Sequence, residues 1–241
     1  MRGESAVGVT EIASRALRTL VETAELFVES ADAADVLFSL ITAELCRVSY
    51  AHQRRSPVSG ALHLEVVFSR REVPWVLSRE TLVASALLKL CSDGAIECHP
   101  ATAAEALASL LKLLRRCHAT PLPPPHDAAQ SAAFEKLVSR FAGGLSNVNA
   151  GVRDASKRAL EEMAALSSQT LGDVLRPVRD TAVLPLMAGQ LRSLPLTTQV
   201  ANLEAVALCL RQTLADGTPL MAIDEALLRL LHEALSAVEA D

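Results

Sequence analysis

The sequence predicts an all-α protein, and three observations carry this prediction. Half of the 241 residues are hydrophobic, yet aromatic residues make up only 3% of the chain, so smaller aliphatic side chains supply most of the apolar content. Leu and Ala dominate it and are strong helix formers, whereas strands favour β-branched and aromatic side chains. Apolar residues also recur at helical spacing along most of the chain. Such a composition suits closely packed helix layers.

The N-terminal half is predicted to hold five helical stretches. Ala61 to Phe68 alternates apolar and polar residues and could be a strand, but its helical neighbours favour a short helix. The polar segment from His52 to Gly60 is predicted to be a loop, and Pro74 interrupts the chain. The five predicted helices are Thr10–Ser30, Asp32–Tyr50, Ala61–Phe68, Arg79–Cys91 and His99–Cys117.

A proline run at Pro121, Pro123, Pro124 and Pro125 is the clearest break in the chain. Prolines in series cannot form a helix, because each lacks the backbone N–H donor. The run divides the sequence into an N-terminal block (1–120), a linker (121–127) and a C-terminal block (128–241). A ligand for an SH3 or WW domain is one interpretation. The run is short and lacks flanking basic residues, which favours a stiff, exposed linker.

Five more helices are predicted after the linker. In the last of them we expect at least one of Leu230 and Leu231 to be buried against the preceding helix, and His232 to lie at the surface. Pro177 and Pro185 interrupt the third. The predicted helices are Ala128–Leu145, Asn149–Leu166, Leu171–Met187, Leu196–Leu210 and Ile223–Glu239.

Helices joined by short turns fit either a globular bundle or an α-solenoid of stacked helix pairs. The string GLSNVNAGVRDASKRAL favours the solenoid. It predicts the end of one helix, an Asn-rich turn, and a helix in which Val152, Arg153 and Asp154 precede alanines at helical spacing. Small alanines let layers approach closely, and Arg153 and Asp154 can pair with neighbouring layers. This pattern is typical of HEAT repeats, so we expect an α-solenoid of HEAT-like antiparallel helix pairs.

The cysteines favour neither disulfides nor a metal. Their odd number and irregular spacing indicate reduced thiols of an intracellular protein. Cys91, Cys98, His99, Cys117 and His118 invite a zinc interpretation, but the pairs of ligands on turns that zinc sites use are missing. We therefore expect buried thiols, surface histidines and no bound metal or cofactor. The five are Cys46, Cys91, Cys98, Cys117 and Cys209.

Catalytic motifs are missing from the sequence as well. There is no Gly-x-Ser-x-Gly turn, and Gly143–Gly144 lack the lysine of a phosphate-binding loop. We expect no catalytic residues, no enzyme activity and no small-molecule substrate. No apolar run reaches the roughly 18 residues needed to span a membrane, and the N-terminus lacks the pattern of a secretory signal.

The formal net charge of -5 argues against a nucleic-acid-binding footprint. Basic clusters nevertheless occur at Arg54–Arg55, at Arg70–Arg71 with Arg79, and at Arg115–Arg116. They could contact nucleic acid or an acidic activation domain. Because they are short and have no interleaved aromatic residues, they favour a solvated rim, and we expect no direct nucleic-acid partner.

Three strings of the C-terminal block resemble a known family. They are VRDASKRALEEMAALSSQTLGDVLRPVRD, LPLMAGQLRSLPLTTQVANLEAVALCL and IDEALLRLLHEALSAVEAD. Over residues 145–241 they resemble, in order, a segment of the TRRAP family (transformation/transcription domain-associated protein and its fungal counterparts). The matching positions are Val152, Arg153, Ala155, Arg158, Ala159, Leu160, Glu161, Glu162 and Leu166, then Leu191, Arg192, Leu194, Pro195, Gln199, Glu204, Ala205, Cys209 and Leu210, and finally Glu225, Leu227, Arg229, Leu230, Leu231, His232, Glu233, Ala234, Leu235 and Glu239.

Two departures concern packing: Leu196 stands where the family has Phe, and the segment from Gln212 to Thr218 lengthens a loop. The first 120 residues match only loosely. The resemblance implies a segment of a very large HEAT solenoid that ends in a kinase fold without catalytic residues. It also implies a nuclear scaffold whose partners are subunits of SAGA-like histone acetyltransferase complexes and transcriptional activators.

Two other classes of protein compete with this scaffold hypothesis. A stand-alone HEAT adaptor, for example in transport or phosphatase assembly, would share the helical pattern but has no reason to carry the last two family strings in order. An enzyme is disfavoured because the catalytic motifs are missing. A solenoid binds through shape and distributed charge, so the sequence names no small set of binding residues.

Overall fold

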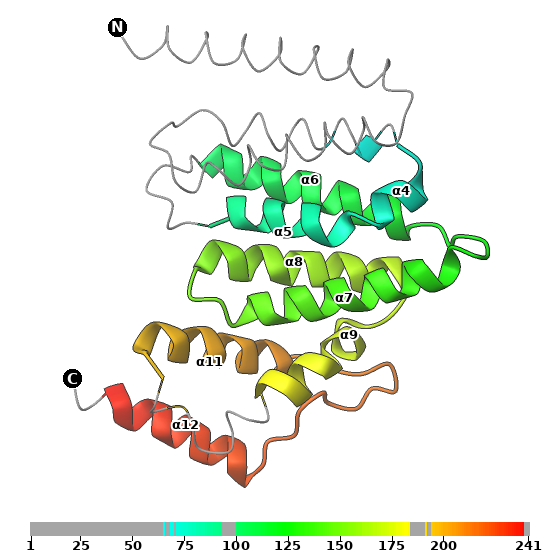
Figure 1. Ribbon diagram of the computed structural model, residues 1–241. Coiled ribbons are helices and arrows are strands. Elements are labelled where there is room, and N and C mark those ends of the chain that lie inside the picture. Colours follow the sequence, from blue (N-terminus) through cyan, green and yellow to red (C-terminus); the bar gives the residue numbers. More distant parts are fainter. Residues whose placement is uncertain are drawn as a thin grey trace, which may run out of the picture. The chain divides into compact units, whose positions relative to one another are not determined.

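The computed structural model describes residues 65, 68–69, 71–92, 100–183, 191 and 194–238, and helices dominate them (Figure 1). Within these residues extended backbone pairs only in an isolated bridge between Thr213 and Pro219. The predicted helices Thr10–Ser30 and Asp32–Tyr50, and the loop between them and residue 61, lie outside this part. The helices are α4 Val73–Leu77, α5 Glu80–Leu90, α6 Pro100–His118, α7 Asp127–Leu145, α8 Ala150–Leu166, α9 Leu171–Val178, the π-helical turn η1 Arg179–Val183, α11 Leu196–Leu210 and α12 Glu225–Val238.

These bounds confirm most of the predicted helices. The predicted range Leu196–Leu210 coincides with α11, and α7, α8 and α12 start within two residues of their predicted starts. Glu65 and Phe68, the two described residues of the predicted short helix, are helical. Pro74 opens α4 near its first position, where a missing N–H costs nothing, rather than separating two segments.

The chain divides into two compact units, Met1–Ala133 and Phe134–Asp241, with the division inside α7. The predicted linker at 121–127 precedes this division. The division of the chain into blocks 1–120 and 128–241 stays a prediction. In the first unit, α5 packs against α6, and α4 contacts both. Their packed sides are largely aliphatic, and the buried side chains include Val83, Leu87, Leu110, Leu113 and Leu114.

A buried polar cluster lies at one end of the α5–α6 pair. Glu80, the first residue of α5, has no exposed surface, and both of its carboxylate oxygens lie 3.0 Å from Nε2 of His118, the last residue of α6. The Cys117 thiol also hydrogen bonds Glu80, and burial together with this carboxylate raises the pKa of the thiol far above its usual range. The prediction that the histidines lie at the surface is wrong for His118, whose side chain is buried at the end of the α5–α6 pair.

The proline linker is exposed, as predicted, and a single side chain holds its start. Gln130 on α7 donates through Nε2 to the carbonyl oxygens of Cys117 and Thr120, at 2.6 and 3.0 Å. Its Oε1 accepts from the backbone N–H of Leu122 at 2.9 Å. Because the prolines offer no donors of their own, these three bonds fix the chain as it leaves α6.

In the second unit, side-chain caps start α8 and α9. The Asn149 side chain accepts from the Val152 N–H at 3.2 Å at the start of α8, and the Thr170 hydroxyl accepts from the Asp173 N–H at 3.1 Å at the start of α9. Both bonds satisfy backbone donors that a helix leaves unpaired at its first turn. Buried residues then follow at helical spacing on α8, namely Val152, Ala155, Ser156, Ala159, Leu160, Met163 and Ala164.

The loop between α11 and α12 lies directly on the first turn of α9. A Cβ atom placed on Gly172 would come within 2.2 Å of the Thr213 carbonyl oxygen, so only glycine permits this approach. The Asp173 carboxylate accepts from the Ala215 N–H at 3.2 Å, and Arg179 donates to the Leu220 carbonyl oxygen at 3.2 Å. The lengthened loop predicted at Gln212–Thr218 is therefore bound to a helix.

Candidate functional site

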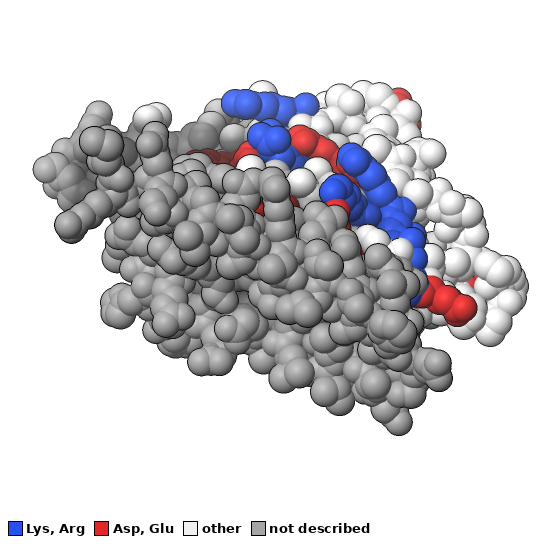
Figure 2. Space-filling view, turned by 90° about the horizontal axis from the view of Figure 1, so that it is seen from above, with Lys and Arg blue, Asp and Glu red and all other residues white. Residues whose placement is uncertain are grey.

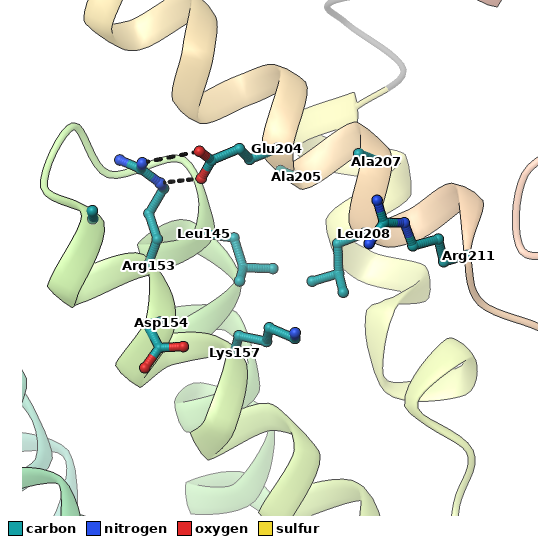
Figure 3. Close-up of a pocket in the computed structure, with 10 residues that line it drawn as sticks. Leu145, Arg153, Asp154, Lys157, Glu204, Ala205, Ala207, Leu208 and Arg211 are labelled. Carbon is teal, nitrogen blue, oxygen red and sulfur yellow. Dashed lines mark hydrogen bonds and ion pairs between the residues drawn. The ribbon is translucent and has the colours of Figure 1, made fainter.

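A groove lies between α8 and α11 in the second unit (Figure 3). It has a volume of about 340 Å³, and the end of α7 contributes to its lining. Leu145 and Leu208 point toward one another across the groove, and Lys157 and Arg211 lie beside them. The lining residues are Leu145, Ala150, Arg153, Asp154, Lys157, Glu204, Ala205, Ala207, Leu208 and Arg211.

An ion pair between Arg153 and Glu204 closes one end of the groove (Figure 3). Nε of Arg153 donates to Glu204 Oε2 at 2.6 Å, and its second nitrogen donates to Oε1 at 3.2 Å. The third nitrogen reaches the carbonyl oxygens of Asn147 and Val148, at 2.9 and 3.0 Å. One guanidinium thus joins α11, α8 and the turn that precedes α8, which makes it a clamp between successive helix pairs.

This clamp confirms half of the pairing that the sequence predicts for the start of α8. Arg153 pairs with the neighbouring layer, as expected. Asp154 instead pairs within its own helix, with Arg158 at 3.0 Å. The two residues are adjacent in sequence and therefore point about 100° apart around the helix, which gives them different partners.

Replacing Arg153 with alanine is expected to lower the free energy of unfolding by about 1–2 kcal/mol, because the change removes a two-point ion pair and two bonds to carbonyl oxygens. Glu204→Ala should cost less, since more than half of the Glu204 side chain is exposed. A double-mutant cycle in urea measures the coupling of the two, and Arg158→Ala, which breaks an exposed pair on the same helix, is the control. Strictly additive losses would show that the Arg153–Glu204 ion pair does not stabilise the fold.

The other two cations of the groove, Lys157 and Arg211, differ in their contacts. Lys157 lies 3.8 Å from Glu161, with both side chains about half exposed, which is a weak surface pair. Among the described residues, none forms an ion pair or hydrogen bond with the Arg211 guanidinium. Sequence reasoning did not single out Lys157 or Arg211. The spacing of four between Arg153 and Lys157, which puts both on one helix face, is the signal that could have found Lys157.

The predicted basic clusters come together in part in the first unit. Arg71 and Arg79 both lie over the ring of Trp75, at 5.9 and 4.2 Å from its centroid, and Arg116 donates to the Arg71 carbonyl oxygen. The argument that no aromatic residue accompanies these clusters is therefore wrong. Arg54–Arg55 and Arg70 lie outside the described residues. Figure 2 shows acidic side chains next to basic ones among the described residues of the face it presents.

Cys91, Cys117 and Cys209 are buried free thiols, and Cys46, Cys98 and His99 lie outside the described residues. Burial raises the pKa of Cys209 to about 11, so this thiol is protonated and unreactive near neutral pH. Within the described part of the chain, no three His, Cys, Asp or Glu side chains converge as metal ligands would. The helices described there are also too short or too polar to cross a bilayer.

Antiparallel helix pairs, alanine-rich contact faces and an arginine clamp between layers define a helical-repeat protein of the HEAT class. A family model described as the Tra1 HEAT repeat ring region matches residues 2–241. The chain therefore belongs to this family, and the match includes the first 120 residues, for which the resemblance was only loose.

Two relatives support the same assignment. The chain is 27% identical over 97 residues to a SAGA complex/NuA4 acetyltransferase complex subunit, Tra1, of Schizosaccharomyces pombe, a region that covers 40% of this chain and 2% of that protein. It is 27% identical over 108 residues to the corresponding Saccharomyces cerevisiae subunit, covering 45% of this chain and 3% of that protein. The matched region is thus a small fraction of each of these relatives.

Proposed function

We propose that this chain is a non-catalytic scaffold segment of a Tra1-like protein, which helps to assemble a histone acetyltransferase complex of the SAGA type in the nucleus and contacts transcriptional activators. Its partners are then proteins, without direct contact to nucleic acid, membrane or a small-molecule substrate. The observation that carries the proposal is the groove between α8 and α11. It combines an apolar floor with accessible cations, which suits a protein segment rather than a reacting small molecule.

The groove has features of a docking surface for protein segments. Leu145 and Leu208 offer apolar contact area, while Lys157 and Arg211 provide charge beside it. The Arg153–Glu204 clamp fixes the spacing of the two helices that form the walls. A preorganised surface loses less conformational entropy when a partner binds. The membership of both relatives in acetyltransferase complexes, by name, supports partners of the same kind here.

Replacing the groove cations Lys157 and Arg211 with glutamate is expected to reduce the amount of partner recovered at least about tenfold. The new carboxylates would repel the acidic groups of a partner that the two cations attract. The test compares the tagged full-length protein with its Lys157→Glu/Arg211→Glu variant by affinity purification and quantitative mass spectrometry. Lys136→Glu/Arg140→Glu makes the same charge change on exposed residues of α7 outside the groove and should leave recovery unchanged.

The identity of the recovered proteins decides between the hypotheses. Acetyltransferase subunits in the wild-type sample, reduced by the groove variant alone, support the proposal. Subunits of a transport or phosphatase assembly would favour the rival, a stand-alone HEAT adaptor. Equal losses in both variants would show that net charge matters and the groove does not.

A further inference from the structure

The loop between α11 and α12 carries a Thr-Pro pair on its exposed side. Among the described residues such pairs occur twice, at Thr120–Pro121 in the linker and at Thr218–Pro219 in this loop, and all four residues are exposed. Proline after a threonine removes the backbone N–H at that position and fixes its φ. Proline-directed protein kinases select their acceptors by this feature. Of the two threonines, Thr218 is the one built into a hydrogen-bonded turn.

Thr218 closes the turn through both backbone and side chain. Its carbonyl oxygen accepts from the Leu214 N–H at 2.8 Å, and Gly217, at a φ of 81°, donates to the Leu214 carbonyl oxygen at 2.9 Å. The Thr218 hydroxyl donates to Asp216 Oδ1 at 2.6 Å, and the Thr218 N–H donates to the same oxygen at 2.9 Å. The hydroxyl is thus one of two donors that stabilise the Asp216 carboxylate at the turn.

Two carboxylates lie at the junction of this turn and α9. The hydrogen bonds from the Thr218 side chain and backbone lower the pKa of Asp216, and the bond from the Thr170 side chain is the main cause of the lowered pKa of Asp173. Both groups are therefore ionised near neutral pH. Asp173 also accepts from the Ala215 N–H at 3.2 Å, a bond that holds the loop on the first turn of α9.

We propose that Thr218 is a phosphorylation site for a proline-directed Ser/Thr kinase, and that its phosphate releases the loop from α9. In the transfer, Oγ1 of Thr218 attacks the γ-phosphorus of Mg·ATP. The new O–P bond forms as the bond to the β-phosphate oxygen breaks, ADP leaves, and the hydroxyl proton passes to the catalytic carboxylate of the kinase.

The release follows from charge and from the loss of a donor. A phosphothreonine carries about -1.5 to -2 charges at pH 7 and no longer donates to Asp216. Its phosphate then lies beside the Asp216 carboxylate that the hydroxyl had held, with Asp173 as a second negative group nearby. Arg176, the cation among the described residues that acts on Asp216, is already paired with Asp173 at 2.8 Å. Repulsion between the phosphate and the Asp216 carboxylate destabilises the turn. Once the turn opens, the Thr213 carbonyl group can move away from Gly172. The α9 start becomes accessible to other proteins.

The test treats the purified chain with a MAP kinase or cyclin-dependent kinase and Mg·ATP, and maps phosphate by tandem mass spectrometry. Phosphate is expected on Thr218, to persist in Thr120→Val and to disappear from position 218 in Thr218→Val. Hydrogen exchange should then show the Leu214, Ala215 and Gly217 amides exchanging roughly tenfold faster in the phosphorylated chain, as expected for local opening of a bonded turn.

Asp216→Asn is the matched control, because it keeps the acceptor oxygen and removes the charge. The phosphate should accelerate exchange clearly less in this variant than in the wild type. Absence of phosphate on Thr218, or labelling confined to Thr120 or to Ser56, which also precedes a proline, overturns the assignment of the site. Full phosphorylation of Thr218 with unchanged exchange in the loop overturns the release.

Discussion

Replacing His118 with leucine is expected to lower the free energy of unfolding by about 3–5 kcal/mol, the largest effect of any single change described for the first unit. The reason is the Glu80 carboxyl group, which has no exposed surface and whose two oxygens both contact Nε2 of His118. Without the imidazole this carboxylate stays in the interior with the Cys117 thiol, a weak donor. Equilibrium unfolding in urea measures the loss.

Two further variants separate loss of the contact from loss of packing. Glu80→Met combined with His118→Leu removes both polar partners, and it should recover most of the stability because no buried polar group is left without its partner. His126→Leu changes an exposed histidine of the linker and should alter stability by less than about 0.5 kcal/mol. If the double variant were as unstable as His118→Leu, packing and not charge would be the cause.

Leu230→Ala and Leu231→Ala are expected to differ strongly although the two residues are neighbours. Leu230 is 2% exposed and Leu231 is 41% exposed. Truncation of a buried leucine costs about 2–5 kcal/mol because it leaves a cavity, whereas Leu231→Ala should cost less than about 1 kcal/mol. Urea unfolding of both variants is the measurement.

His232→Ala, on an exposed residue of the same helix, serves as the control and should cost less than about 0.5 kcal/mol. Equal stability of all three variants would contradict the burial of Leu230. Equal loss in both leucine variants would instead show that the outer face of α12 is covered in solution. That face is rich in exposed aliphatic side chains, namely Leu228, Leu231 and Leu235.

Periodicity and end signals predicted the helices because both act locally. Pro195 caps the start of α11, because a proline disfavours helical backbone at the residue before it. The Asn149 cap sets the start of α8. At the last helix, the sequence left open which of Leu230 and Leu231 is buried, since both lie near the middle of an apolar stripe. The structure settles this choice through packing with the rest of the unit.

The site depends on contacts between residues that are distant in sequence, which local patterns do not specify. Glu204 pairs with Arg153 across 51 positions, and His118 meets Glu80 across 38. A histidine at the end of an amphipathic helix is usually solvated, so the sequence offered no reason to bury His118. The position of Trp75, four residues from both Arg71 and Arg79, is a local signal of their stacking that the charge pattern alone does not contain.

The close approach at Gly172 ties the length of one loop to the identity of a residue in another helix. A substituted side chain at this position and the loop as it lies here cannot coexist, because a Cβ would also come within 2.8 Å of the Thr213 carbonyl carbon, a backbone atom that no rotamer change can move away. The two features therefore have to be gained or lost together. A repeat that shortens the loop frees its helix start to carry alanine, a better helix former, while a repeat that keeps it must retain glycine.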